Sequence, residues 1–170
     1  TYNQAHTLPR AINSVLNQTY NNWELIIIDN HSNDNTDTII KNYENPKIHL
    51  LKINNYGIIA KSRNLGIKRA KGELLAFLDS DDWWTIDKLE VSIGEMKRFN
   101  AELTFHNIYR VKENKLFYRT SRCKKIEGDI FNNLIHDGNF IINSSVVVKK
   151  YLITKIGYLS EEKEIRTWED

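Results

Sequence analysis

The sequence predicts an α/β fold in which a mostly parallel central sheet carries helices on both faces. Helical and strand patterns alternate over the first hundred residues, and the strand segments are short, continuous apolar runs. Such runs are typical of strands buried on both faces, as in parallel sheets. Their alternation with helices indicates crossover connections that place helices on both sides of one sheet.

The composition predicts one globular domain. The chain has 170 residues, of which 41% are hydrophobic and 27% are charged, which is ordinary for a soluble protein. Its net charge of +2 is too close to neutral for a nucleic-acid binder. The single cysteine, Cys123, excludes an internal disulfide framework and fits a reducing compartment. No apolar run reaches the ~18 residues that a membrane span needs.

The first helix and strand are predicted by capping and periodicity. Thr7 can cap a helix that has Pro9 in its first turn. One face of this helix is apolar and carries Leu8, Ile12, Val15 and Leu16. The β-branched run 23–29 predicts a buried strand. The Asn, Asp and Ser cluster 30–35 predicts a turn, with a short helix to follow over 36–43.

Two further strand and helix units complete the first hundred residues. A strand is predicted over 47–53, followed by a helix that carries Ile59, Arg63, Ile67 and Ala70. A third strand is predicted over 73–78. The next helix is expected to start at Thr85 and to turn inward Ile86, Leu89, Ile93 and Met96.

The later part of the chain predicts mixed elements. These are a hairpin of 103–111 with 116–119, a short helix over 129–136, an apolar strand over 140–148 and a helix over 149–156. No linker separates them from the first part, so we expect a single domain.

Three acids, Asp79, Asp81 and Asp82, follow the third strand directly. Ligands of open α/β sheets bind outside the carboxyl ends of strands, and Asp79 and Asp81 face the same side of an extended chain. Their oxygen ligands suit Mn²⁺ or Mg²⁺ shared with substrate phosphates. A helix N-terminus that favours acids is the alternative, and it leaves Asp79 unexplained. An aspartyl phosphatase that uses Asp79 as its nucleophile is a second alternative.

Several motifs stand in a recognisable order. They are Thr1-Tyr2-Asn3, Ser14-Val15-Leu16-Asn17-Gln18-Thr19-Tyr20, Trp23-Glu24-Leu25-Ile26-Ile27-Ile28-Asp29, Ser62-Arg63-Asn64-Leu65-Gly66-Ile67, Ala70-Lys71-Gly72-Glu73, Leu78-Asp79-Ser80-Asp81-Asp82-Trp83-Trp84 and Trp168-Glu169-Asp170. Together they resemble the family 2 glycosyltransferases, which have the GT-A fold, a Rossmann-like fold of nucleotide-diphosphosugar transferases. The resemblance covers nearly the whole chain.

The resemblance implies an inverting, metal-dependent hexosyltransferase that moves a sugar from a nucleotide diphosphate donor to an acceptor hydroxyl. The implied donor-binding residues are Thr1, Tyr2, Asp29, Asn30, Arg63, Asp79 and Ser80. Asp79 and Asp81 would form the DxD motif, with Asp81 and Asp79 as ligands of Mn²⁺ or Mg²⁺. Asp170 would be the general base. Loss of catalysis, which would leave a nucleotide-sugar binding module, is the alternative to this activity.

The resemblance also implies partners and a location. A UDP-sugar is the favoured donor, although Asn30 stands where the family commonly has the acid that accepts from uracil. The acceptor would be a saccharide or lipid-linked saccharide for surface polysaccharide or lipopolysaccharide. The protein would be cytoplasmic, with peripheral association at the inner face of the membrane, and would bind no nucleic acid.

Two further expectations concern the ends of the chain and the polar residues near the acids. We expect residues 1–170 to be one GT-A catalytic domain that lacks its first strand and its C-terminal part. Of Trp83 and Trp84, one is expected to pack inside, and the other is left open as a sugar platform. The segment Asn143-Ser144-Ser145 is either acceptor-cleft lining or strand interior.

Overall fold

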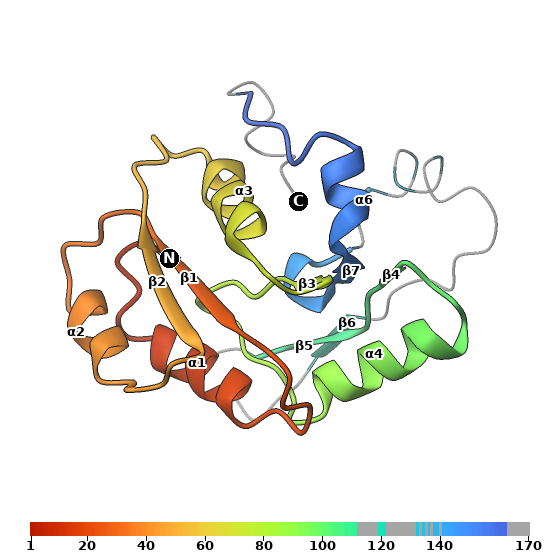
Figure 1. Ribbon diagram of the computed structural model, residues 1–170, viewed down its shortest axis with the longest axis horizontal. Coiled ribbons are helices and arrows are strands. Elements are labelled where there is room, and N and C mark those ends of the chain that lie inside the picture. The colour runs from red at the N-terminus through yellow and green to blue at the C-terminus, as the bar shows by residue number, and fades with distance from the viewer. Residues whose placement is uncertain are drawn as a thin grey trace.

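The computed structural model describes residues 1–111, 119–121 and 141–162, with the single positions 132, 134, 136, 138 and 139. Its helices are α1 (Leu8–Leu16), α2 (Thr36–Lys41), α3 (Ile59–Arg69), α4 (Lys88–Arg98), α6 (Lys150–Lys155) and the 3₁₀ turn η1 (Asn143–Ser145). Its strands are β1 (Leu25–Asp29), β2 (Ile48–Lys52), β3 (Leu74–Ala76), β4 (Leu103–Thr104), β5 (Ile108–Arg110), β6 (Arg119–Ser121) and β7 (Val147–Lys149). Figure 1 shows their arrangement.

Helices cover both faces of the first strand pair, as expected (Figure 1). β1 and β2 pair in parallel over their whole length. Successive residues of β1 point to opposite faces. Ile27 packs with the buried residues Leu8, Ile12 and Ile40 of α1 and α2. Ile28 lies instead on the opposite face of the strand, beside Gly66 of α3.

The second group of strands is antiparallel and also has two covered faces. β7 lies between β3 and β4 and runs antiparallel to both. Leu74 of β3 packs against the cluster that includes Val15 of α1 and Ile93 of α4. Its neighbour Leu75 belongs to the opposite cluster, with Ile67 of α3 and Val148 of β7. β3 therefore ends between two hydrophobic cores.

The α/β class is confirmed, and three details of the prediction are wrong. Among the described strands only β1 and β2 pair in parallel, because β7 returns beside β3 in the opposite direction. The helix expected from Thr85 begins at Lys88, and Ile86 is 61% exposed rather than inward. The strand expected over 140–148 is interrupted by η1, because the Ser145 backbone and hydroxyl both donate to the Ile142 carbonyl.

The other elements of the later part are confirmed where they are described. β5 and β6 pair antiparallel, as the predicted hairpin requires, while its turn at 112–118 lies outside the described residues. α6 matches the helix predicted over 149–156. Most of the helix predicted over 129–136 lies outside the described residues, so that prediction stays open.

Candidate functional site

Asp79 follows β3 and forms an ion pair with Arg63 from the middle of α3. Arg63 Nη2 lies 3.2 Å from Asp79 Oδ1, and the two side chains are 11% and 42% exposed. The Asn143 amide oxygen accepts from Arg63 Nε at 3.1 Å and from Nη2 at 2.9 Å. In the reverse orientation the Asn143 amide nitrogen, a donor, would face the N–H donors of Arg63. Only its 3.4 Å hydrogen bond to Asp79 Oδ1 would then remain. A largely buried guanidinium is thus fixed beside a half-exposed carboxylate.

Three carboxylates gather on the loop that begins at Asp79. Burial raises the pKa of the Asp82 carboxyl, a hydrogen bond from Ser144 opposes that rise, and the charges of Asp81 and Asp79 add to it. Asp81 is exposed, and its carboxylate accepts no hydrogen bond from the residues that the structure describes. A bound cation would relieve the repulsion among these acids.

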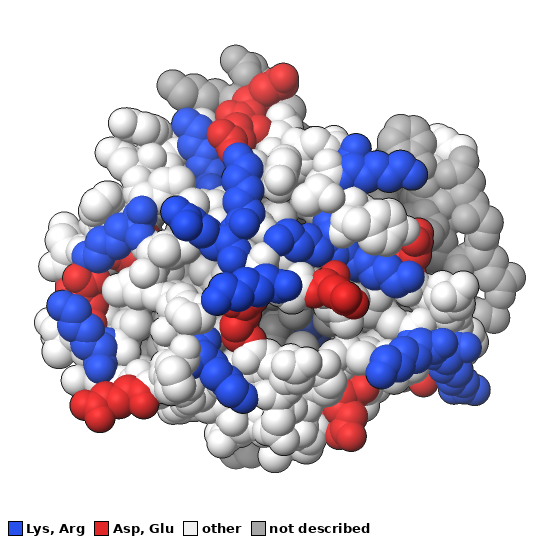
Figure 2. Space-filling view, viewed as in Figure 1, with Lys and Arg blue, Asp and Glu red and all other residues white. Residues whose placement is uncertain are grey.

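The donor set fits a divalent ion such as Mn²⁺ or Mg²⁺ that substrate phosphates help to hold. No group of three or more His, Cys, Asp or Glu side chains in the described ranges is placed to hold an ion alone. Asp79 and Asp81 would therefore leave ligand positions for phosphate oxygens and water, which is usual for Mg²⁺ sites. Figure 2 shows basic and acidic side chains gathered around a hollow near the middle of one face.

The 3₁₀ turn η1 supports the acidic loop, a role that the sequence did not indicate. The Ser144 hydroxyl accepts from the Asp79 backbone N–H at 3.0 Å. The Ser144 carbonyl accepts from Trp84 Nε1 at 2.8 Å. Trp84 is buried and packs with α1 and α4, so it is the tryptophan expected to pack inside. The only signal in the sequence was a polar Asn-Ser-Ser triplet inside an apolar run.

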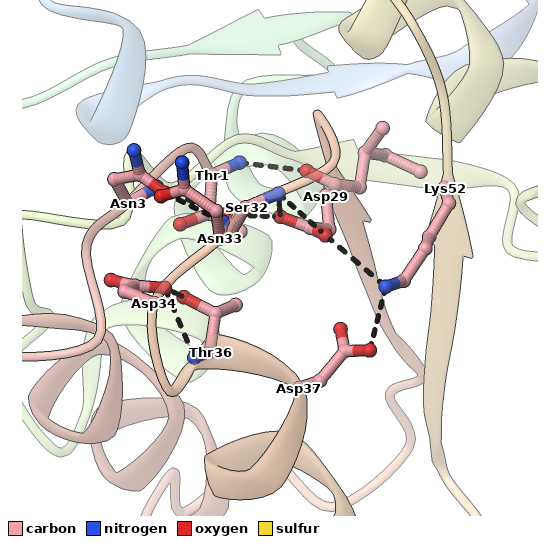
Figure 3. A network of polar contacts seen from close by, with 10 residues as sticks. Thr1, Asn3, Asp29, Ser32, Asn33, Asp34, Thr36, Asp37 and Lys52 are labelled. Carbon is pink, nitrogen blue, oxygen red and sulfur yellow. Dashed lines mark hydrogen bonds and ion pairs between the residues drawn. The ribbon is translucent and has the colours of Figure 1, made fainter.

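Asp29, at the end of β1, lies in a closed polar network (Figure 3). Its carboxylate accepts from the Ser32 hydroxyl at 2.5 Å and from the Ser32 backbone N–H at 3.2 Å. Lys52 Nζ lies 3.8 Å from the Asp29 carboxylate and donates to Asp37 at 2.6 Å. The bond to Asp37 raises the pKa of Lys52. Asp29 is 0% exposed, so its carboxylate oxygens bond to groups within the protein and are not open to a ligand.

The rest of the loop after β1 forms a turn and a helix start, as its composition predicts. Asp34 accepts from the Thr36 backbone at 3.1 Å and from its hydroxyl at 2.6 Å, and also from the Ala5 backbone at 2.9 Å. These hydrogen bonds lower the pKa of Asp34. The Asn3 side chain accepts from the Asn33 backbone N–H at 2.9 Å. The N-terminal segment is thereby tied to this loop (Figure 3).

Thr1, Tyr2 and Asn30 come together at the carboxyl end of β1. The Thr1 backbone nitrogen donates to the Ile28 carbonyl at 2.7 Å, and the Thr1 carbonyl accepts from the Asn30 N–H at 2.9 Å. Tyr2 is 55% exposed. The Asn30 side-chain oxygen accepts from the Asn55 backbone N–H at 2.9 Å, so it faces the chain that follows β2.

The loops after β1 and β3 are joined through residues near the N-terminus. The Ser80 hydroxyl donates to the Gln4 side-chain oxygen. Arg10 of α1 donates to the Asp81 backbone carbonyl at 2.7 Å, and its guanidinium lies 3.8 Å from the centre of the Trp83 ring. Trp83 is 42% exposed, and it lines a pocket along α1. The structure therefore gathers the expected donor residues at one end of the strands.

The expected general base lies outside the described residues. Asp170 and its neighbours Trp168 and Glu169 follow the last described position, Glu162. The role of Asp170 therefore stays a prediction. No described helix is long and apolar enough to cross a membrane.

Comparisons with known proteins agree with the resemblance. The family model described as "Glycosyl transferase family 2" matches residues 1–157. The UDP-Glc:alpha-D-GlcNAc-diphosphoundecaprenol beta-1,3-glucosyltransferase WfgD of Escherichia coli is 39% identical over 74% of this chain and 50% of its own length. WfaP of Escherichia coli, described by the same activity, is 38% identical over 66% of this chain and 45% of its own length.

A solved structure confirms the fold. Staphylococcus aureus TarS 1–349, crystallised in complex with UDP, superposes with a TM-score of 0.81 at 22% identity, over 99% of this chain and 50% of TarS 1–349. At that identity the likeness supports the GT-A fold alone. The chain spans about half the length of the relatives that it matches.

Proposed function

The chain belongs to glycosyl transferase family 2, and from this premise we propose that it transfers a sugar from a nucleotide diphosphate donor to an acceptor hydroxyl with inversion. One observation carries the proposal. The guanidinium of Arg63 is paired to Asp79 at the carboxyl end of β3, and two residues further along the chain the exposed carboxylate of Asp81 accepts no hydrogen bond from the described residues. A positive group fixed beside a free acid is the arrangement that a diphosphate and its cation require.

The chemistry follows from where charge develops. The departing diphosphate gains negative charge as the glycosidic bond breaks, and the guanidinium of Arg63, held beside Asp79, would stabilise that charge. A divalent ion on Asp81 and Asp79, when bound, would supply further stabilisation at the diphosphate oxygens. The Asp170 carboxylate would take the proton of the attacking hydroxyl. A single displacement of this kind inverts the anomeric carbon.

The donor and acceptor are proposed from the relatives. TarS was crystallised with UDP and with UDP-GlcNAc, and WfgD is named for UDP-Glc and a diphosphoundecaprenol acceptor. For this chain we infer a UDP-sugar donor near Thr1, Tyr2 and Asn30, and a lipid-linked saccharide acceptor. We propose that the reaction belongs to surface polysaccharide or lipopolysaccharide synthesis and takes place at the cytoplasmic face of the membrane.

The proposal assigns Asp29 a supporting role among the expected donor-binding residues. Its carboxylate is fully buried and is bonded to Ser32, so it shapes the loop that presents Asn30. Asp79 would be shared between Arg63 and the cation, whereas the carboxylate of Asp81, which accepts no hydrogen bond from the described residues, would bind only the cation.

A transfer assay with the full-length protein tests the proposal. UDP-glucose and UDP-GlcNAc are offered with a diphosphoundecaprenol-linked saccharide, with Mn²⁺ or with EDTA. Transfer that needs Mn²⁺ is expected, and absence of both transfer and donor hydrolysis would overturn the proposal. Asp170→Asn should abolish transfer and keep UDP binding, because only the proton acceptor is lost. Retained transfer in that variant would exclude Asp170 as the base.

A further inference from the structure

Ser144 is the residue through which η1 holds the acidic loop. It is 6% exposed, and its hydroxyl and its backbone carbonyl both bond to the loop. Its hydroxyl accepts from the Asp79 N–H at 3.0 Å, and its carbonyl accepts from Trp84 Nε1 at 2.8 Å. The Ser144 hydroxyl also lowers the pKa of Asp82, against the effect of burial. These contacts span the whole loop from its first acid to the buried tryptophan that ends it.

The position of Ser144 follows from the sheet register. β3 and β7 are antiparallel, with Ala76 paired to Val147. Continuing that register by three residues places Asp79 opposite Ser144. There η1 interrupts the ladder, so the serine hydroxyl replaces a backbone carbonyl as the acceptor for Asp79. The Ser144 carbonyl is then available to Trp84.

We propose that Ser144 is a positioning residue that presents Asp79 and Asp81 to one divalent cation. The inference rests on the proposed function, and it adds a residue that touches neither the cation nor the donor. The acidic loop is short and carries three mutually repelling charges, so its shape needs an external anchor. Mutation of a residue that orients the ligands of a metal ion typically lowers the affinity for the metal by about 10–100-fold.

The neighbouring serine provides a matched control. Ser145 is 0% exposed, and its hydroxyl donates to Ile142 within the same turn and not to the loop. Ser144→Ala and Ser145→Ala each remove one buried hydroxyl from η1. Both variants are expected to lower the melting temperature, but only Ser144→Ala leaves the Asp79 N–H without its acceptor.

The experiment measures Mn²⁺ binding by electron paramagnetic resonance, with UDP present, in the full-length protein. Ser144→Ala is expected to weaken Mn²⁺ binding by roughly 10–100-fold, and Ser145→Ala by less than about twofold. Equal Mn²⁺ affinity in Ser144→Ala and wild type would overturn the role of Ser144 and leave the proposed function standing. Absence of Mn²⁺ binding in wild type would overturn both.

A second variant covers the case in which Ser144→Ala does not fold. Trp84→Phe removes the indole N–H that donates to the Ser144 carbonyl and keeps an aromatic ring in the core. It is expected to weaken Mn²⁺ binding several-fold, because the loop loses one of its anchors on Ser144. Wild-type Mn²⁺ affinity in folded Trp84→Phe would count against the inference.

Discussion

The loops that follow β1 and β3 both contain acids, but these acids differ in their burial and in their hydrogen-bond partners. Asp29 after β1 is 0% exposed and bonds to Ser32 and Lys52. Asp81 after β3 is exposed, and no described residue donates to its carboxylate. The same residue type at the same end of two strands is therefore structural in one loop and available to a ligand in the other. The number of protein partners separates the two roles.

One lysine near each of these loops also differs in the number of its polar partners. Lys52 beside β1 lies near two carboxylates, those of Asp37 and Asp29. Lys88, at the start of α4, is 4% exposed, and its Nζ has no hydrogen-bond partner in the described part of the chain. It lies 4.0 Å from the centre of the Trp84 ring. Burial lowers the pKa of Lys88 to about 7.

The largest effect is expected at the exposed acid. Asp81→Asn should lower transfer by about 100-fold or more, or ~3 kcal/mol of transition-state stabilisation, because it removes a ligand of the cation at the leaving diphosphate. Steady-state kinetics at saturating Mn²⁺ and donor measure the loss. The melting temperature should stay near that of wild type, since the Asp81 carboxylate is exposed and accepts no hydrogen bond from the described residues, and the Arg10 bond goes to the Asp81 backbone carbonyl. Wild-type activity in this variant would break the contrast between the two loops.

The next effect is on stability and falls at Asp29. Asp29→Asn should lower the free energy of unfolding by about 1–3 kcal/mol, because an amide NH₂ in place of Oδ2 would face the Ser32 N–H and the Lys52 ammonium, which are donors, and the buried negative charge would be lost. Urea denaturation of the variant and wild type measures the difference. Unchanged stability together with lost UDP binding would mean that the Asp29 carboxylate contacts the donor directly.

A pH-dependent effect is expected at Lys88. Its folded-state pKa of about 7 lies below the ordinary value of 10.5, so the unfolded state binds more protons between these values. Stability from this group therefore rises with pH across that window, and the burial penalty is fully present below pH 7. Lys88→Met should raise the melting temperature at pH 6 to 7, with a smaller gain near pH 10.

Thermal unfolding of Lys88→Met and wild type across this pH range makes the test. If Lys88→Met were less stable than wild type at pH 6, the buried ammonium of Lys88 would be stabilised by its surroundings. The difference drawn between Lys88 and Lys52 would then be wrong.

The smallest effect is expected at Lys52. Its side chain is 37% exposed and solvent screens its charge, so Lys52→Gln should change stability less than Asp29→Asn does. Denaturation midpoints at low and high salt measure it. A loss as large as that of Asp29→Asn would mean that the ion pair, and not the Ser32 hydrogen bonds, holds the network together.

Hydrophobic patterns within single segments predicted much of the fold, because they indicate which side chains of a helix or strand are buried. The apolar run that became β1, the amphipathic helix that became α1 and the acids after β3 were all predictable from short stretches of sequence. The side chain of Thr7, predicted to cap α1, makes no capping hydrogen bond and donates to the Gln4 carbonyl instead. The ion pair between Asp29 and Lys52 was not predictable, because only the parallel register with β2 brings Lys52 alongside Asp29. A pattern within one segment carries no information about which segment will lie beside it.

The support at η1 was missed for a related reason. An apolar run over 140–148 predicts a strand, and the part that forms β7 does pair as one. The turn at Ser144 arises where the antiparallel register meets the end of β3, about 65 residues earlier in the chain. Only the long-range pairing shows that a buried serine there faces Asp79 rather than the core.

The central claim is that the acids after β3 bind the donor through a cation, whereas Asp29 after β1 is structural. Calorimetric titration of UDP into the full-length protein, with and without Mn²⁺, tests it most directly. Mn²⁺ should strengthen UDP binding in wild type and in Asp29→Asn at a temperature where that variant is folded, but not in Asp81→Asn. Equal UDP affinity with and without Mn²⁺ in wild type would contradict the account.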